Sequence, residues 1–316
     1  MVILNMKSSI SILIPAWNEE KIILRTCKFL RNLSLPFQYR EIIFIAGGTD
    51  KTYEICRDIN LENFNKILIL RQNPGDFKSG ALIKGMQKAK GDIITIIDAD
   101  TLVAPNFMIE VTKALRKYDV VNCNYIPMIK KGFWYDYYNI NKLIWSRKPD
   151  NLLSLFGAST ISLNRAVVEE IGIDNFFTNR STAGVDHYMG VVLGKNKKII
   201  GFVRNSRVIT PRPGCLNDFK KDQSRWFTAF FQIHQDEKRM IFITFILSCL
   251  LLIPFTVLLY NLKKIKNITL NNKLKIRSYF ILFFTEYFMN LLRFKAILEI
   301  FLRRVKNLVY FKGARY

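Results

Sequence analysis

Short apolar runs rich in β-branched residues alternate with helical patterns through the first hundred residues, and this alternation limits the possible folds more than any other feature. The predicted strands cover residues 9–15, 41–46, 66–70 and 93–97, and the predicted helices end near residue 32 or cover residues 53–59 and 81–90. Strands separated by helices at this spacing indicate βαβ crossovers. We therefore expect an α/β domain built on a parallel or mixed sheet.

The next hundred residues carry a less regular pattern. Strands are predicted at residues 120–126, 154–163, 198–204 and 207–210, and helices at residues 133–145, 165–171, 182–193 and 216–232. Together with the first hundred residues, these elements define a predicted catalytic domain over residues 1–235.

Two carboxylates follow the most apolar of the predicted strands, Ile93–Ile97. Side chains alternate along an extended chain, so Asp98 and Asp100 can converge beyond the sheet edge, where α/β proteins bind ligands. Two hard oxygen donors suit Mg²⁺ or Mn²⁺, which commonly take one or two carboxylates together with phosphate oxygens. The alternative is a polar turn in which either aspartate caps the next helix.

The charge of the chain is strongly basic and unevenly distributed. The formal net charge is +23, and thirteen Lys or Arg residues after Tyr260 face only Glu286 and Glu299. Such an excess indicates an anionic partner, either nucleic acid or an acidic membrane surface. The aromatic and aliphatic residues of this tail favour the membrane, and we expect no nucleic-acid partner.

Residues 236–316 are predicted to form a membrane-associated helical region. Residues 241–260 carry no charge and are long enough to cross a bilayer, and a second apolar stretch covers residues 279–302. Six Lys or Arg residues lie between the two stretches, and this basic loop opposes two full crossings. A re-entrant or in-plane hairpin avoids that conflict, and a helical cap without any membrane contact is the alternative.

The cysteines and the N-terminus indicate a reducing compartment. The five cysteines are scattered without metal-binding spacing, at Cys27, Cys56, Cys123, Cys215 and Cys249. The apolar run at residues 2–5 is too short for the core of a signal peptide. We expect a protein at the cell membrane whose catalytic domain lies on the cytoplasmic side.

Several short motifs occur in an order that resembles one enzyme family. They are Ile14-Pro15-Ala16-Trp17-Asn18-Glu19, Gly48-Thr49-Asp50-Lys51-Thr52, Lys78-Ser79-Gly80-Ala81-Leu82, Ala89-Lys90-Gly91-Asp92, Asp98-Ala99-Asp100, Phe156-Gly157-Ala158 followed by Arg165, Gly184-Val185-Asp186, and Arg225-Trp226. Over about residues 9–232 the chain resembles a family-2 glycosyltransferase of the GT-A fold. That class includes polyprenyl-phosphate sugar synthases and membrane-bound polysaccharide synthases.

The resemblance implies a nucleotide-sugar site. Base and ribose would contact Pro15, Ala16, Trp17, Glu19 and Asp50. Lys78 would lie near the phosphates, where an ammonium at a helix N-terminus favours anions, although a solvated lysine is the commoner fate. In the Asp98-Ala99-Asp100 motif, Asp98 would contact ribose or the metal, and Asp100 would ligate the cation.

Asp186 is the predicted general base. An inverting transferase needs one carboxylate opposite the leaving group to take the proton of the acceptor hydroxyl. The alternative is a helix N-cap. If the acceptor is an ionised lipid phosphate, no base is needed and Asp186 has a positioning role.

Arg225 and Trp226 resemble the end of the Gln-x-x-Arg-Trp motif of the family, with Asp222 at the glutamine position. Arg225 would bind the diphosphate, and Trp226 would stack on sugar or acceptor. Members of the family usually have an Asp-Asp pair before the Gly-Ser turn, and this chain has Ile45-Ala46 there. A carboxylate that usually contacts the base is therefore missing, and the sequence does not distinguish a uridine donor from a guanosine donor.

The resemblance implies metal-dependent, inverting transfer of a sugar from a UDP- or GDP-sugar to a membrane lipid, a lipid-linked glycan or a polysaccharide. A metal-dependent nucleotidyltransferase and a non-catalytic membrane scaffold are the alternatives. The first usually carries a Gly-rich basic loop after its first strand, whereas this chain has Pro15-Ala16-Trp17-Asn18-Glu19-Glu20 there. The second rests only on the two altered motifs.

Overall fold

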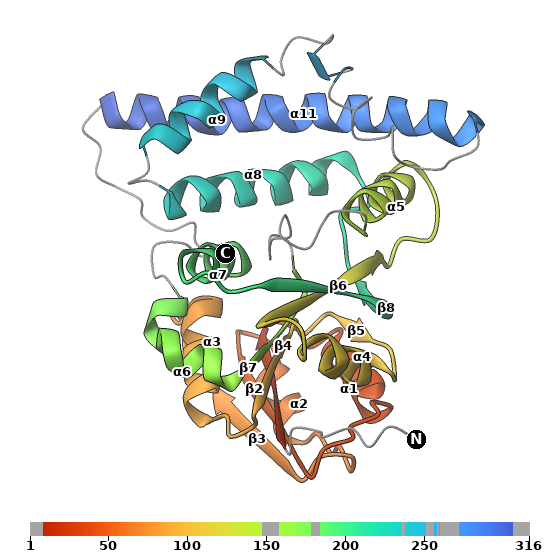
Figure 1. Ribbon diagram of the computed structural model, residues 1–316, viewed down its shortest axis with the longest axis vertical. Coiled ribbons are helices and arrows are strands. Elements are labelled where there is room, and N and C mark those ends of the chain that lie inside the picture. The colour runs from red at the N-terminus through yellow and green to blue at the C-terminus, as the bar shows by residue number, and fades with distance from the viewer. Residues whose placement is uncertain are drawn as a thin grey trace. The chain divides into compact units, whose positions relative to one another are not determined.

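The computed structural model describes residues 9–146, 158–177, 184–234, 238–250, 256–257, 259 and 272–305. It forms two compact units, Met1–Arg212 and Pro213–Tyr316 (Figure 1). The division comes before the boundary expected after residue 235, so the helix predicted at residues 216–232 belongs to the second unit.

The first unit is built on a mixed sheet of eight strands. They are β1 Ser9–Trp17, β2 Tyr39–Gly47, β3 Lys66–Arg71, β4 Ile93–Ile97, β5 Leu102–Val103, β6 Val120–Pro127, β7 Thr160–Asn164 and β8 Ile200–Thr210. Their order in the sheet is β3-β2-β1-β4-β7-β6-β8-β5. Strands β3, β2, β1 and β4 run parallel, β7 is antiparallel to β4 and β6, and β6 is parallel to β8.

Helices cover both faces of this sheet (Figure 1). They are α1 Ile23–Arg31, α2 Thr52–Arg57, α3 Phe77–Lys88, α4 Phe107–Ala114, α5 Phe133–Ser146, α6 Arg165–Ile171, the 3₁₀ turn η2 Ile173–Phe176, and α7 Val185–Lys195. Side chains of α1, α2 and α4 pack on one face, and those of α3, α6 and α7 pack on the other.

Strand β1 shows why the first strands read as continuous apolar runs. Ile12 and Ile14 face the layer of α1, α2 and α4, whereas Leu13 between them faces the layer of α3, α6 and α7. All three side chains are fully buried. A strand with helices on both faces buries apolar side chains at successive positions, so the two-residue alternation of a half-exposed strand is lost.

The structure corrects several predicted boundaries. Residues 198–204 and 207–210, expected as two strands, form the single strand β8, which pairs with β6 through a register shift between Cys123 and Tyr125. Helix α3 begins at Phe77, before the predicted start at residue 81. Strand β5 and helix α4 had no predicted counterpart. The strand expected at 154–163 and the helix expected at 182–193 each begin outside the described residues.

The second unit is helical in its described part. It contains α8 Leu216–Ile233, α9 Lys238–Leu250 and α11 Asn272–Val305. Phe227 and Phe231 of α8 pack against Leu292 and Ile297 of α11. Within the described residues, none of the helices combines the length and the hydropathy that crossing a bilayer requires. Part of the apolar stretch 241–260 lies outside those residues.

Candidate active site

Hydrogen bonds hold the turn after β4 in place on both sides. The backbone N–H of Asp98 donates to the carbonyl of Ser159 at 3.1 Å, and the Thr26 hydroxyl of α1 donates to the carbonyl of Ala99 at 2.6 Å. The Ala99 side chain is buried in the core, whereas Asp98 and Asp100 on either side of it are only partly buried. Because side chains alternate here, the two carboxylates share the side that faces away from the core.

Lys78 forms an ion pair with Asp98. The lysine belongs to the first turn of α3, and about a third of each side chain is exposed. Burial works against the lysine charge, but Asp98, followed by Asp186 and Asp100, raises the pKa of Lys78 above its ordinary value. The ammonium is therefore held among three carboxylates.

Negative charge is concentrated around the end of β1. Burial, followed by the charges of Asp100, Asp98 and Asp50, raises the pKa of Glu19 from 4.5 to about 7, against the opposing charge of Lys78. Burial and the charge of Asp98 likewise raise the pKa of Asp100. Burial and the neighbouring carboxylates both disfavour the charged forms of Glu19 and Asp100, so an added cation would be attracted.

Asp50 holds two loops together. One carboxylate oxygen accepts hydrogen bonds from the Thr52 N–H at 3.0 Å and the Thr52 hydroxyl at 2.6 Å, and the other accepts from the Glu20 N–H at 3.2 Å. Burial opposes ionisation of Asp50, but these hydrogen bonds outweigh it and lower its pKa. Asp50, which is a predicted nucleotide contact, thus uses both carboxylate oxygens to join the loop after β1 to the turn after β2.

Pro15, Ala16 and Trp17 occupy the last three positions of β1, beside Gly47 of β2. Ala16 is buried in the core, and Pro15 and Trp17 are partly buried. A side chain built on Gly47 would come within 3.0 Å of the Trp17 ring. Glycine at position 47 therefore leaves room for the indole at the strand end.

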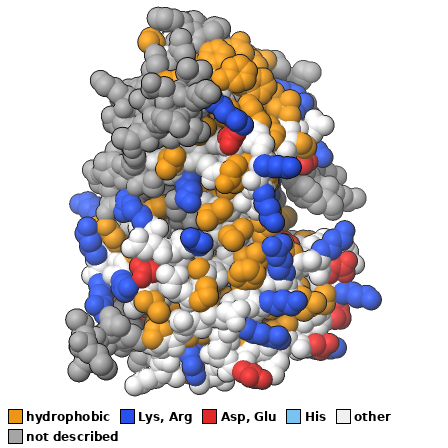
Figure 2. All heavy atoms as spheres, turned by 90° about the vertical axis from the view of Figure 1, so that its right-hand side faces the viewer, with side chains coloured by type: hydrophobic (Ala, Val, Ile, Leu, Met, Phe, Trp, Pro, Cys, Tyr) orange, Lys and Arg blue, Asp and Glu red, His pale blue; other side chains and the backbone are white. Residues whose placement is uncertain are grey.

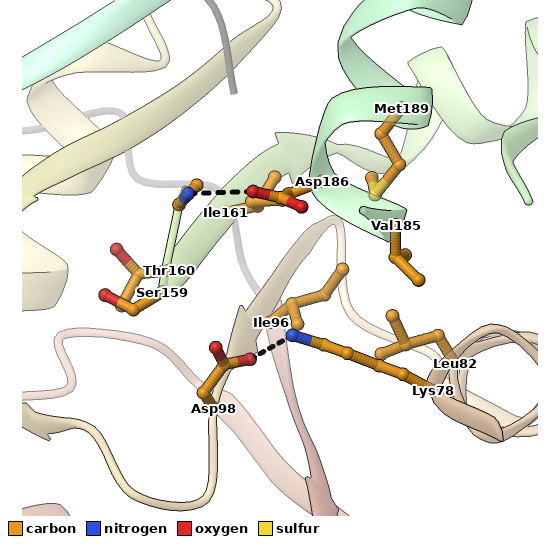
Figure 3. A pocket seen from close by; sticks show the side chains of 11 residues that line it. Lys78, Leu82, Ile96, Asp98, Ser159, Thr160, Ile161, Val185, Asp186 and Met189 are labelled. Carbon is orange, nitrogen blue, oxygen red and sulfur yellow. Dashed lines mark hydrogen bonds and ion pairs between the residues drawn. The ribbon is translucent and has the colours of Figure 1, made fainter. Parts of the chain in front are cut away.

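Asp186 lies across a small pocket from Lys78 and Asp98 (Figure 3). Its side chain is buried and accepts a hydrogen bond from the Ala158 N–H at 3.0 Å. The N-cap of α7 is Gly184, whose φ is 74°, and no side chain caps this helix. Asp186 therefore connects α7 to the segment before β7, and the alternative interpretation of Asp186 as an N-cap is wrong.

Arg225 and Trp226 lie on α8 in the second unit. The guanidinium of Arg225 forms an ion pair with Asp222 at 2.8 Å and lies 5.9 Å from the centre of the Trp226 ring. Asp222, which occupies the glutamine position of the family motif, thus contacts the motif's arginine. The assignment of Arg225 and Trp226 to the donor site stays a prediction.

Two residues near the pocket were not identified from the sequence. Arg212 follows β8, its guanidinium lies 4.0 Å from the centre of the Tyr125 ring, and its charge acts on Asp100. Ser159 lines the pocket, and its buried hydroxyl has no hydrogen-bond partner among the described atoms. The sequence could have indicated Ser159, because it directly follows the Phe156-Gly157-Ala158 motif. No sequence pattern indicates Arg212, because its proximity to Asp100 depends on the pairing of β5 with β8.

The carboxylates fit a divalent cation only with help from a ligand. Within the described part of the chain, no three His, Cys, Asp or Glu side chains form a group that could hold a metal ion alone. Asp100 and Asp98 supply hard oxygen donors whose mutual repulsion a cation would relieve. Mg²⁺ and Mn²⁺ are commonly held in this way, by one or two carboxylates and the oxygens of a bound phosphate.

Comparison with known proteins identifies the family and agrees with the fold. The model for Glycosyl transferase family 2 matches residues 11–172, just over half of the 316 residues, and the model for Glycosyl transferase family group 2 matches residues 93–300. Both matches include Asp98, Asp100 and the strand that carries them.

Two curated relatives match a shorter stretch. The probable glycosyltransferase YdaM of Bacillus subtilis is 39% identical over 101 residues, which are 30% of this chain and 24% of the relative. The beta-monoglucosyldiacylglycerol synthase of Nostoc sp. is 34% identical over 131 residues, which are 40% of this chain and 28% of the relative. The chain therefore matches about a quarter of the length of these relatives.

One solved structure resembles nearly the whole chain. The mannosyltransferase PcManGT from Pyrobaculum calidifontis, in complex with GDP-Man and Mn²⁺, aligns with a TM-score of 0.56 and 15% identity over 98% of this chain and 77% of that one. At this identity the similarity establishes the fold alone, which is the GT-A fold expected from the motifs.

Proposed function

The chain belongs to glycosyl transferase family 2, and from this premise we propose that it transfers a sugar from a UDP- or GDP-sugar to an acceptor with inversion at the anomeric carbon. One observation carries the proposal: Lys78, Asp98 and Asp186, from three different elements, line the same pocket beside Asp100. This arrangement offers positive charge for a diphosphate and a carboxylate for an acceptor.

Each side chain has a defined task in the proposed reaction. Lys78 supplies a positive charge to the leaving diphosphate, and Asp98 keeps the ammonium in position through their ion pair. Asp186 accepts the proton of the acceptor hydroxyl while the acceptor oxygen bonds to the anomeric carbon and the bond to the diphosphate breaks. The Ala158 N–H holds the Asp186 carboxylate during this transfer.

Asp100, with Asp98, would hold Mg²⁺ or Mn²⁺. The cation, when bound, would neutralise the negative charge that develops on the leaving nucleoside diphosphate. The raised pKa of Asp100 supports this role, because a carboxylate beside other carboxylates gains most from an added cation. The mannosyltransferase of similar fold was solved with Mn²⁺, which is consistent with the same use here.

The proposed acceptor is a membrane lipid, a lipid-linked glycan or a polysaccharide, and the proposed location is the cytoplasmic face of the cell membrane. One relative is named a beta-monoglucosyldiacylglycerol synthase, which makes a lipid acceptor plausible chemistry for this family. The basic, apolar sequence after Tyr260 supports attachment to an anionic membrane.

Calorimetric titration of the full-length protein with UDP and with GDP tests the donor site. We expect at least one of them to bind in the presence of Mn²⁺ and to bind at least tenfold more weakly without it. Asp100→Asn should remove this metal dependence, because the neutral amide is a poorer ligand for a hard cation. Asp58→Asn, an exposed aspartate paired with Arg57, is the matched control and should bind as the unchanged protein does.

Metal-dependent binding that survives in Asp100→Asn would contradict the proposed site. Turnover separates the alternatives: a transferase releases a nucleoside diphosphate from a nucleotide sugar, whereas a nucleotidyltransferase consumes a nucleoside triphosphate and releases pyrophosphate. A scaffold without activity would do neither.

A further inference from the structure

Exposed large hydrophobic side chains are concentrated on two helices of the second unit. Phe280 of α11 is 66% exposed and Phe242 of α9 is 62% exposed. The described residues of this kind on the two helices are Phe242, Ile243, Ile246, Leu247, Leu250, Phe280, Phe284, Leu291 and Leu298, called here the α9–α11 face. Apolar patches of this size on a protein surface mark sites of interaction.

The exposed residues of α11 form one continuous stripe. Arg277, Phe280, Phe284, Leu291, Lys295 and Leu298 follow one another at intervals of three, four or seven residues, which places them on one side of a helix. Ile281, Leu282 and Leu292 on the other side are buried. The helix therefore has two apolar sides, of which only one contributes to the packing of the unit.

Helix α9 shows the same division. The Phe245 ring stacks on the Phe294 ring of α11, with 6.0 Å between their centres. Among the described residues of α9, the exposed ones from Phe242 to Leu250 lie on positions that do not make this contact, and they are all aliphatic or aromatic.

The charges near the α9–α11 face are positive. Arg277 and Lys295 are exposed on the stripe of α11, whereas Glu286 of the same helix is buried away from it. The sequence between Leu259 and Arg277 contains five lysines and no aspartate or glutamate. Figure 2 shows hydrophobic side chains gathered at the top of the view, with Lys and Arg side chains and some Asp or Glu side chains beside them.

We propose that the α9–α11 face docks in the plane of an anionic lipid bilayer. Its Phe, Ile and Leu side chains would enter the boundary between headgroups and acyl chains, while Arg277 and Lys295 would contact anionic headgroups. The proposal deepens the proposed function, because it names the surface that would bring the transferase to a lipid-borne acceptor.

Charge favours a bilayer over a second copy of the chain as the partner. Two copies paired through this face would bring Arg277 and Lys295 close to the same residues of the other copy, in a chain whose net charge is already +23. Like charges brought together at an interface are unfavourable, whereas anionic headgroups complement them.

Vesicle flotation of the full-length protein tests the proposal. We expect binding to phosphatidylcholine vesicles containing phosphatidylglycerol, with at least a tenfold loss in the variant Phe280→Glu/Phe284→Glu. The matched control is Leu24→Glu/Ile199→Glu, which places the same two charges at apolar side chains that are 55% and 54% exposed in the first unit, and it should bind as the unchanged protein does. The variant Arg277→Glu/Lys295→Glu should lose most of the preference for anionic vesicles over neutral ones.

Three results would overturn the proposal. The Phe280→Glu/Phe284→Glu variant could bind vesicles as well as the control, the protein could resist extraction from vesicles at alkaline pH as a spanning protein does, or light scattering could show that this variant abolishes a dimer without changing vesicle binding. Nucleotide binding of each variant, measured by calorimetry, tests the donor site separately. If Phe280→Glu/Phe284→Glu binds vesicles as well as the control does and nucleotide binding is intact, only the membrane face is overturned. If vesicle binding changes as expected but the protein does not bind the nucleotide, only the proposed function is overturned.

Discussion

At the scale of single residues, the candidate site is a group of partly buried carboxylates. Lys78 is paired with Asp98, and Arg212 acts on Asp100 from beside the Tyr125 ring. Burial, followed by the charges of the neighbouring aspartates, raises the pKa of Glu19 to about 7. Such a site favours cations and protons alike, and the two should compete.

Glu19 should make stability depend on pH. Its pKa in the fold lies above its ordinary value of 4.5, so the folded protein binds the proton more tightly. The stability from this proton is complete below about pH 4.5 and is lost as the pH rises to about 7. The loss should not exceed about 3 kcal/mol, since one pKa unit equals about 1.4 kcal/mol and partial exposure screens the charge.

Urea unfolding of the metal-free protein at pH 5 and pH 7.5 measures this effect. The variant Glu19→Gln should unfold with a smaller difference between the two pH values, because it no longer titrates. An unchanged difference would show that the pH dependence has another origin.

Asp186 should matter for turnover and little for donor binding. The variant Asp186→Asn keeps an oxygen to accept the Ala158 N–H but cannot take a proton. We expect kcat with a hydroxyl acceptor to fall by about 10² to 10⁴-fold, and the affinity for the nucleotide to stay within a factor of about three. Full turnover in this variant would show that Asp186 is not the base. Asp186 would then have only a positioning role, as expected if the acceptor is an ionised lipid phosphate.

At the scale of elements, the turn between α3 and β4 is held more tightly than its sequence suggests. A side chain on Gly91 would come within 2.3 Å of the backbone of Ile10, so β1 and this turn touch directly. Buried Glu41 accepts hydrogen bonds from the Ser11 and Tyr39 hydroxyls and from the Lys90 N–H. Because β4 leads to Asp98, this anchoring sets the position of the carboxylates.

Arg165, part of the family motif, belongs to the same anchoring. Its Nε donates to the Gly91 carbonyl at 2.8 Å and a terminal nitrogen donates to the Ala89 carbonyl at 2.7 Å. We expect Arg165→Ala to lower the free energy of unfolding by about 1–3 kcal/mol, because partly buried carbonyls lose their donors. Denaturant unfolding of this variant gives the value.

The matched control is Arg31→Ala. Arg31 also donates through its guanidinium to a backbone carbonyl, that of Asn60, but on the exposed surface, where water replaces it. Its loss should cost less than about 1 kcal/mol. Equal effects of the two variants would contradict a structural role for Arg165.

At the scale of the whole molecule, the chain consists of two units with different characters. The first carries the mixed sheet and the candidate donor site, and the second carries the α9–α11 face. Asp98, Asp186 and Lys78 all belong to the first unit, whereas Arg225 and Trp226 belong to the second. Nucleotide binding should therefore act on the two units unequally.

Scanning calorimetry with nucleotide and Mn²⁺ should reveal this inequality. A ligand at one hundred times its Kd adds about 2.7 kcal/mol to the stability of the unit that binds it. We expect the unfolding transition of the first unit to move to higher temperature. An unchanged transition of the first unit would contradict a donor site at Lys78, Asp98 and Asp186.

The sequence by itself determined the GT-A fold class, the family and the strand that precedes Asp98. These depend on information that is local in the chain: the strand Ile93–Ile97 matches its predicted bounds because buried β-branched runs specify strands directly. The helix Arg165–Ile171 also matches its predicted bounds. Strand β5 was missed because a two-residue strand has no periodicity to detect.

Only the tertiary structure decided which distant residues meet. The hydroxyls of Thr101 and Thr210 lie 3.3 Å apart although 109 residues separate them, and this contact brings the segment before Arg212 next to the turn that carries Asp100. The Lys78–Asp98 pair, the Asp186 contact with Ala158 and the division after Arg212 arise in the same way. Each depends on the order of strands in the sheet, which periodicity along one segment does not contain.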